Sequence, residues 1–186
     1  MRTPTMLTSV IALLPLALAL PLESREANEF DIVSLGATLP YKSGPYGSGD
    51  VDSFLTISVT YPDVSSTSEA TLTTQCTHDW PKGTDPNAFE WAPCDDPALQ
   101  WRLPADGWVY QTNYVVELFL PKGDNGSGLD ASHQLRQDPN HVLPNAYLSC
   151  IQMGKFQPLR CDLGGPLAAL QGPVVMPGDE VSSRPN

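Results

Sequence analysis

The sequence predicts an all-β fold, either an antiparallel β-barrel or a β-sandwich, stapled by two disulfides. Short segments rich in Val, Ile, Thr, Tyr and Trp alternate apolar and polar residues with a period of two, which is typical of half-buried strands. Turn-forming residues separate these segments, and the chain of 186 residues contains 14 Gly and 19 Pro. The four cysteines form two couples of near neighbours. Many short strands with frequent turns favour a closed or sandwiched antiparallel sheet.

In the first half of the chain, the folded part begins at residues 30–35. Residues 53–61 form the clearest strand, because Leu55, Ile57 and Val59 alternate with mainly hydroxylic side chains. A Pro-Asp pair ends this segment, and alternation resumes over residues 69–76. These two segments predict a β-hairpin.

In the second half, residues 99–103 form a short strand that a turn separates from the next segment. Residues 107–120 predict one long strand, since Val, Tyr, Thr and Trp dominate it. Short strands follow over residues 132–136 and 146–153, with weaker strand candidates at 156–161 and 167–170, the latter alternatively a turn of helix.

The chain is long enough for one ordinary domain and too short for two well-buried cores. Residues 1–25 have the pattern of an export signal with a possible short pro-segment: Arg2, an apolar run shorter than a membrane span, and the small-x-small motif Ala17–Ala19. Residues 26–170 then form a single β domain. Residues 171–186 contain three prolines and mostly small or charged residues, and they predict a flexible C-terminal tail.

The cysteines indicate an oxidising compartment. Of the three possible connectivities, Cys76–Cys94 and Cys150–Cys161 are favoured because each closes a short loop with strand-like flanks. A four-cysteine metal site is the rival interpretation, but no close C-x₂-C spacing supports it and export favours oxidation. We expect no metal and no cofactor.

One modification motif accompanies the export signal. Asn125-Gly126-Ser127 matches the N-glycosylation acceptor and lies in a Gly-rich stretch that predicts an exposed turn. We expect Asn125 to carry a glycan.

The charge balance excludes some classes of partner. The chain holds 10 Lys and Arg against 21 Asp and Glu, a formal charge of −11. Such a polyanion is repelled by nucleic acid and by anionic lipid, so we expect neither nucleic-acid binding nor membrane docking after signal removal.

No convincing catalytic constellation is present, and we expect the protein not to be an enzyme. His78, His133 and His141 fit no zinc spacing and no hydrolase motif. A ribonuclease-like acid–base set could be assembled from His133, Arg136 and Glu117, but the strongly negative charge of the chain argues against a phosphate substrate. The adjacent carboxylates Asp95 and Asp96 are more typical of a solvated turn than of a glycosidase pair or a calcium ligand.

The aromatic residues of the loop between Cys76 and Cys94 are the candidate interaction patch. Trp80, Phe89 and Trp91 lie there among Pro, Gly and Asn. They either fold back over the core or form an exposed aromatic patch.

The spacing of these features resembles a family of fungal secreted proteins related to the major allergen of Alternaria alternata. The matching pieces are 21–25, 54–58, 71–76, Trp91-Ala-Pro-Cys94, 143–150 and Arg160-Cys161. The resemblance implies a β-barrel stapled by two local disulfides and an effector or elicitor acting toward a plant host. The major allergen has a further cysteine that joins two subunits. No cysteine lies between residues 25 and 75 here, so no intersubunit disulfide is expected, although a non-covalent homodimer is compatible with the sequence.

Two functions follow as expectations. The first is a secreted, non-enzymatic interaction protein in the host apoplast whose acidic surface selects a basic extracellular host protein. The second is an extracellular carrier that holds a small planar apolar ligand in the barrel or at a subunit junction. A small secreted hydrolase ranks third.

Overall fold

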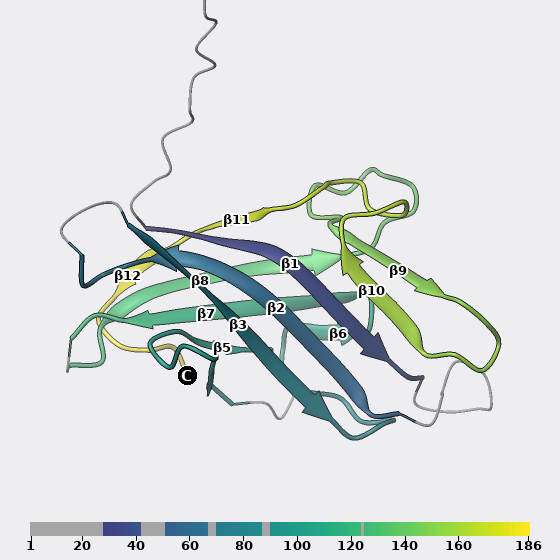
Figure 1. Ribbon diagram of the computed structural model, residues 1–186, viewed down its shortest axis with the longest axis horizontal. Coiled ribbons are helices and arrows are strands. Elements are labelled where there is room, and N and C mark those ends of the chain that lie inside the picture. The colour runs from purple at the N-terminus through teal and green to yellow at the C-terminus, as the bar shows by residue number, and fades with distance from the viewer. Residues whose placement is uncertain (1–27, 42–50, 67–69, 87–89, 124) are drawn as a thin grey trace, which may run out of the picture.

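The computed structural model describes residues 28–41, 51–66, 70–86, 90–123 and 125–186. These residues form twelve β-strands in two antiparallel sheets that pack face to face (Figure 1). The predicted export signal lies outside them. They contain no helix with the length and hydropathy needed to cross a membrane.

The first sheet, sheet A, faces the viewer in Figure 1. Its strand order is β3-β2-β1-β10-β9, and β11 also pairs with β1. Its strands are β1 (Glu29–Leu39), β2 (Ser53–Pro62), β3 (Thr71–Trp80), β9 (Leu148–Gln152), β10 (Leu159–Leu163) and β11 (Val174–Pro177). The predicted hairpin is present, since β2 and β3 pair along ten residues from Ser53–Trp80 to Pro62–Thr71.

The second sheet, sheet B, lies behind it, with the order β12-β8-β7-β5-β4 and with β6 paired to β7. Its strands are β4 (Ala92–Pro93), β5 (Gln100–Arg102), β6 (Trp108–Tyr110), β7 (Asn113–Pro121), β8 (Gly128–Arg136) and β12 (Asp179–Val181). Of the two predicted architectures, the molecule is sandwich-like and not a closed barrel, because no strand pairing among the described residues joins one sheet to the other.

The core fills the space between the sheets. Alternate residues of β2 point inward and are buried, as the period-two pattern predicts, while Thr56, Ser58 and Thr60 lie on the outer face. The largest fully buried side chains come from both sheets: Trp101, Tyr61, Tyr114 and Phe30. Burial of this apolar surface, at about 25 cal/mol per Å², holds the two layers together.

The prediction of one long strand over residues 107–120 is wrong. The segment folds into a tight hairpin in which β6 turns through Gln111 and Thr112 into β7. The side chain of Gln111 donates to the carbonyls of Leu39 and Pro40, at 3.2 and 2.8 Å, and this fixes the turn against β1. Trp108 and its partner Tyr114 have the same parity, so this pair also fits a single strand, and only the register shift between Trp108 and Tyr110 departs from the alternation. The weak candidate at 167–170 is a turn, with Ala168 N–H donating to the Gly165 carbonyl.

The prediction of a flexible tail over residues 171–186 is also wrong. Phe30 of β1 pairs with Met176 of β11, and Leu129 of β8 pairs with Glu180 of β12. Val174 and Met176 are completely buried, whereas Val175 between them is 44 % exposed. We call residues 174–186 the C-terminal strap, because they cross from sheet A to sheet B (Figure 1). Apolar burial and two sets of ladder hydrogen bonds outweigh the local preference of Pro and Gly for irregular structure.

Both predicted disulfides are confirmed. Cys76–Cys94 closes a separation of 18 residues and Cys150–Cys161 one of 11. Cys150 and Cys161 are direct cross-strand partners in β9 and β10. Cys76 lies within β3, and its bridge holds the segment that follows Cys94 beside that strand.

Candidate interaction surface

The predicted aromatic patch does not form around Trp80. This side chain is 5 % exposed and belongs to the core. Its ring stacks on His78 with centroids 5.6 Å apart and meets Trp108 edge-on at 5.8 Å. Since β3 continues four residues beyond Cys76, inward alternation places Trp80 between the sheets, and that part of the prediction is wrong.

Trp91 is half-buried and already has several intramolecular partners. Its indole N–H donates to the Pro185 carbonyl at 2.9 Å, so the C-terminal strap holds it. The Arg102 guanidinium lies 4.5 Å from the ring centroid, and the Phe119 ring approaches edge-on at 5.9 Å. Phe89 lies outside the described residues. Trp80 and Trp91 therefore do not present an open aromatic surface to a partner.

A groove lies elsewhere, along the free edge of β3. It has a volume of about 640 Å³ and is lined by hydroxyl, amide and carboxylate groups: Ser58, Thr73, Thr74, Gln75, Asp95, Asp96 and Pro97. We call it the β3 groove. One wall is the strand, and the other is the turn after Cys94, which the Cys76–Cys94 disulfide tethers. Among these lining residues there is no Lys or Arg.

Two hydrogen bonds from backbone N–H groups fix the turn against the strand. The Asp95 N–H donates to the Gln75 carbonyl at 2.8 Å, and the Asp96 N–H donates to the Thr74 hydroxyl at 2.8 Å. The first contact shows that the backbone groups of Gln75 point outward, away from β2. In an antiparallel ladder, residues two apart point the same way, so the N–H and C=O groups of Thr71 and Thr73 also face this edge. Within the groove the Gln75 carbonyl is taken by Asp95, whereas no described residue pairs with the backbone groups of Thr73.

The side chains of the two carboxylates differ in role. Asp95 is exposed, whereas Asp96 accepts a hydrogen bond from the buried Tyr61 hydroxyl and another from the Ala98 N–H at 2.9 Å. The hydrogen bond from Tyr61, with the one from Ala98, holds the pKa of Asp96 below its usual range, so Asp96 is ionised at neutral and mildly acidic pH. Burial, reinforced by Asp96, raises the pKa of Tyr61. Asp96 is a structural anion, and Asp95 is the free one.

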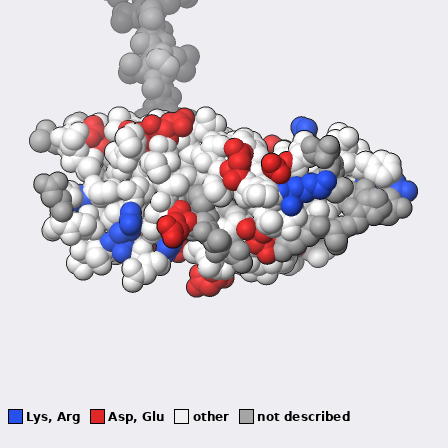
Figure 2. Space-filling model, turned by 90° about the horizontal axis from the view of Figure 1, so that it is seen from below, with Lys and Arg blue, Asp and Glu red and all other residues white. Residues whose placement is uncertain are grey.

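Charge is dispersed on one face of the molecule. Seen from below, Asp and Glu side chains form several separate groups with Lys and Arg among them, and much of this face is uncharged (Figure 2). On this face the acidity predicted from composition is therefore dispersed, whereas the β3 groove holds a local pair of carboxylates.

The catalytic sets considered from the sequence are not brought together. His133 pairs with Val116 and faces the inside of the sandwich, where its ring meets Tyr147 edge-on and burial lowers its pKa. Glu117 and Arg136 have the opposite parity and lie on the outer face of sheet B. Glu117 pairs instead with Arg102 at 2.5 Å. Within the described part of the chain, no three His, Cys, Asp or Glu residues gather in a way that would hold a metal ion.

No family model, curated protein or solved structure matches this chain.

The glycosylation motif lies at the turn between β7 and β8. Asn125 is exposed, and its Oδ1 accepts hydrogen bonds from the Ser127 N–H at 3.2 Å and the Ser127 hydroxyl at 2.6 Å. The Ser127 hydroxyl also lies 3.1 Å from the Lys122 carbonyl. An exposed acceptor at a hairpin turn is accessible to a glycosyltransferase.

We expect the protein secreted from a eukaryotic host to carry one N-glycan at Asn125. Peptide N-glycosidase should increase its gel mobility and convert Asn125 to Asp, as mass spectrometry of the peptide would show. Asn125→Gln should abolish the shift without changing Tm, because the side chain is exposed. Secreted wild-type protein with an unmodified Asn125 would contradict the expectation.

Proposed function

We propose that this protein is a secreted, non-enzymatic interaction protein that binds an extended basic segment of an extracellular partner in the β3 groove. The observation that carries the proposal is the pairing of a free strand edge with two carboxylates in one groove. A partner strand would hydrogen-bond to the backbone of β3, and its Lys or Arg side chains would meet Asp95 and Asp96.

The edge itself supports this mode of binding. Proteins that do not use an edge strand usually protect it with charges, prolines or bulges. Residues 71–77 of β3 contain none of these, and their pairing with β2 is regular. Cross-strand hydroxyl contacts, at 3.0 Å between Thr56 and Thr77 and at 3.1 Å between Thr60 and Thr73, hold the outer face in register without adding charge.

Extracellular location also belongs to the proposal. Two intramolecular disulfides support it, because such bridges persist in oxidising compartments. An effector or elicitor acting on a plant host is the biological setting that the sequence resemblance suggests. The carrier function has less support, because buried side chains from both sheets fill the space between them.

Fluorescence anisotropy with a labelled peptide that alternates Lys and Thr tests the proposal. We expect binding that weakens between low and physiological salt, and no binding of the matched Glu-Thr peptide. Asp95→Asn should weaken binding about two- to fivefold, since an exposed ion pair contributes about 0.2–1 kcal/mol. Asp106→Asn removes another exposed carboxylate, in the turn before β6. It should change peptide affinity only by the small amount that the loss of any one surface negative charge causes.

A second variant tests the strand addition. The Thr73 N–H faces the edge, so Thr73→Pro removes a donor that β2 does not use, and prolines are tolerated at such positions. We expect an unchanged circular dichroism spectrum and loss of peptide binding. Equal binding of the Lys and Glu peptides, or full binding by folded Thr73→Pro, would overturn the proposal.

A further inference from the structure

A second hollow lies on the outer face of sheet A, at the end where the β9–β10 hairpin projects. Its volume is about 500 Å³, and it shares no lining residue with the β3 groove. It is lined by Phe54, Thr38 and Arg160, by residues 51–52, and by residues 156–158 of the hairpin turn. We call it the end hollow.

The floor of the end hollow is a row of cross-strand partners. Phe54 of β2 pairs with Thr38 of β1, which pairs with Arg160 of β10. Partners in adjacent strands project on the same face, so an aromatic ring, a hydroxyl and a guanidinium follow one another across the sheet. Ile151 of β9, 36 % exposed, extends the row beyond Arg160.

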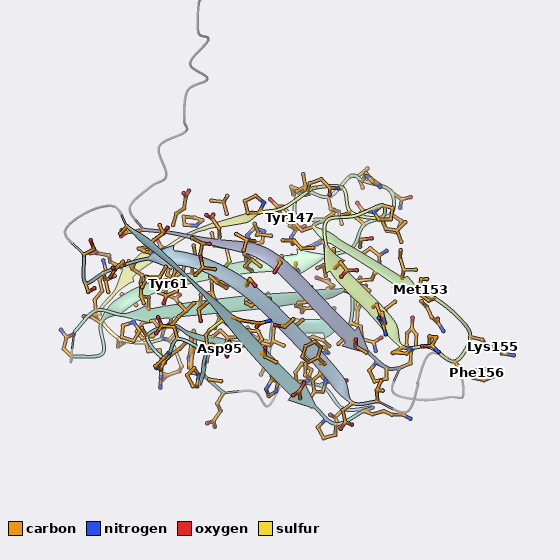
Figure 3. The ribbon with its side chains drawn as sticks, viewed as in Figure 1. Tyr61, Asp95, Tyr147, Met153, Lys155 and Phe156 are labelled. Atoms are coloured by element: carbon orange, nitrogen blue, oxygen red, sulfur yellow. A yellow bond between two sulfur atoms is a disulfide. The ribbon has the colours of Figure 1, made fainter. Side chains whose placement is uncertain are left out.

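The outer wall is the turn between β9 and β10. The Gln152 side-chain amide donates to the Gly154 and Lys155 carbonyls at 2.9 and 3.3 Å, and the Gln157 N–H donates to the Gly154 carbonyl at 3.0 Å. These contacts give the turn a defined shape. Phe156, 61 % exposed, extends from it at the end of the molecule (Figure 3). The wall is therefore preformed, and Phe156 and Pro158 supply its apolar part.

The two charged residues that line the end hollow, Arg160 and Asp52, differ in their partners. Arg160 is exposed and makes no ion pair with any described residue. Asp52 also lines the hollow, but its Oδ1 accepts the Lys82 N–H at 3.0 Å. The guanidinium keeps its donors for a ligand, and such donors form strong charge-assisted bonds to carboxylates and sulfonates.

We propose that the end hollow binds a small amphiphilic anion, an aromatic or alkyl body bearing one carboxylate or sulfonate group. The anionic group bonds to Arg160, with the Thr38 hydroxyl beside it, and the apolar body lies between Phe54 and Phe156. A volume of about 500 Å³ is within the range of about 300–1,000 Å³ for small-ligand pockets. The site is independent of the proposed peptide binding.

Two dyes that differ by one sulfonate test this proposal on the intact protein. They are 8-anilinonaphthalene-1-sulfonate and its neutral analogue N-phenyl-1-naphthylamine, each titrated by fluorescence. We expect saturable one-to-one binding of the sulfonate. Arg160→Gln should weaken sulfonate binding about tenfold and leave the neutral dye unchanged, since only the charge-assisted bond is lost. Arg184→Gln makes the same chemical change on an exposed arginine outside the hollow and should have no effect.

Two further variants distinguish this hollow from nonspecific dye adsorption. Asp52→Asn removes the repelling carboxylate and should strengthen sulfonate binding about two- to threefold. Phe156→Ala should weaken the binding of both dyes several-fold. Because the side chain is exposed, it should leave Tm unchanged. Equal affinity of wild type and Arg160→Gln for the sulfonate, or no saturable binding, would overturn the proposal.

Discussion

Met176→Ala should lower the free energy of unfolding by about 2–5 kcal/mol, the range for truncating a fully buried Met. Met176 is completely buried and lies opposite Phe30 in the β1–β11 ladder. The substitution removes apolar contacts between the C-terminal strap and the core and leaves a cavity that a close-packed interior fills only partly. Urea denaturation followed by tryptophan fluorescence measures the change.

Val175→Ala is the matched control for this experiment. Val175 is the neighbouring residue of β11, but its side chain is 44 % exposed on the opposite face. We expect its effect to stay within about 0.5 kcal/mol. Equal stability of Met176→Ala and Val175→Ala would mean that the strap does not pack on the sandwich.

Replacing either pair of bridged cysteines by alanine should cost about 3 kcal/mol. Closing loops of 18 and 11 residues restricts the unfolded chain by similar amounts on the chain-entropy model. Denaturation of the two double variants, Cys76→Ala with Cys94→Ala and Cys150→Ala with Cys161→Ala, measures both losses.

The two disulfide variants should differ in binding. Only Cys76–Cys94 tethers the turn that forms one wall of the β3 groove. Its removal should therefore also weaken binding of the Lys-Thr peptide under conditions where the protein remains folded. The Cys150–Cys161 variant is the control, because it should lose about the same free energy of unfolding. Equal loss of peptide affinity in both variants would contradict the role of Cys76–Cys94 in holding the groove wall.

The sequence was most informative where a short segment determines its own environment. Alternation over residues 53–61 predicted β2 and its buried face, because side-chain direction in a strand depends only on parity. The spacing of the cysteines predicted both bridges, because each joins segments that are close in the chain. Asn125 was correctly expected in an exposed turn.

Features that depend on distant partners were not predictable in this way. The strand β11 is so short that only Val174 and Met176 show its alternation, and their burial depends on β1, far earlier in the chain. The choice of sandwich over barrel depends on pairings between strands that the sequence pattern does not specify. The β3 groove was missed because Asp95 and Asp96 resembled an ordinary turn, and only the contact with Gln75 shows that the turn lies beside a strand edge. The end hollow combines β1, β2 and β10, which no local motif connects.

The crossing of the C-terminal strap has a consequence for biosynthesis. Phe30 belongs to the earliest described strand, yet its ladder partner Met176 lies far later in the chain. A nascent chain therefore cannot complete either sheet until β11 and β12 have left the ribosome, and such non-local pairing is intrinsically slow. Until then the edges of β1 and β8 that the strap will pair with stay open to other strands.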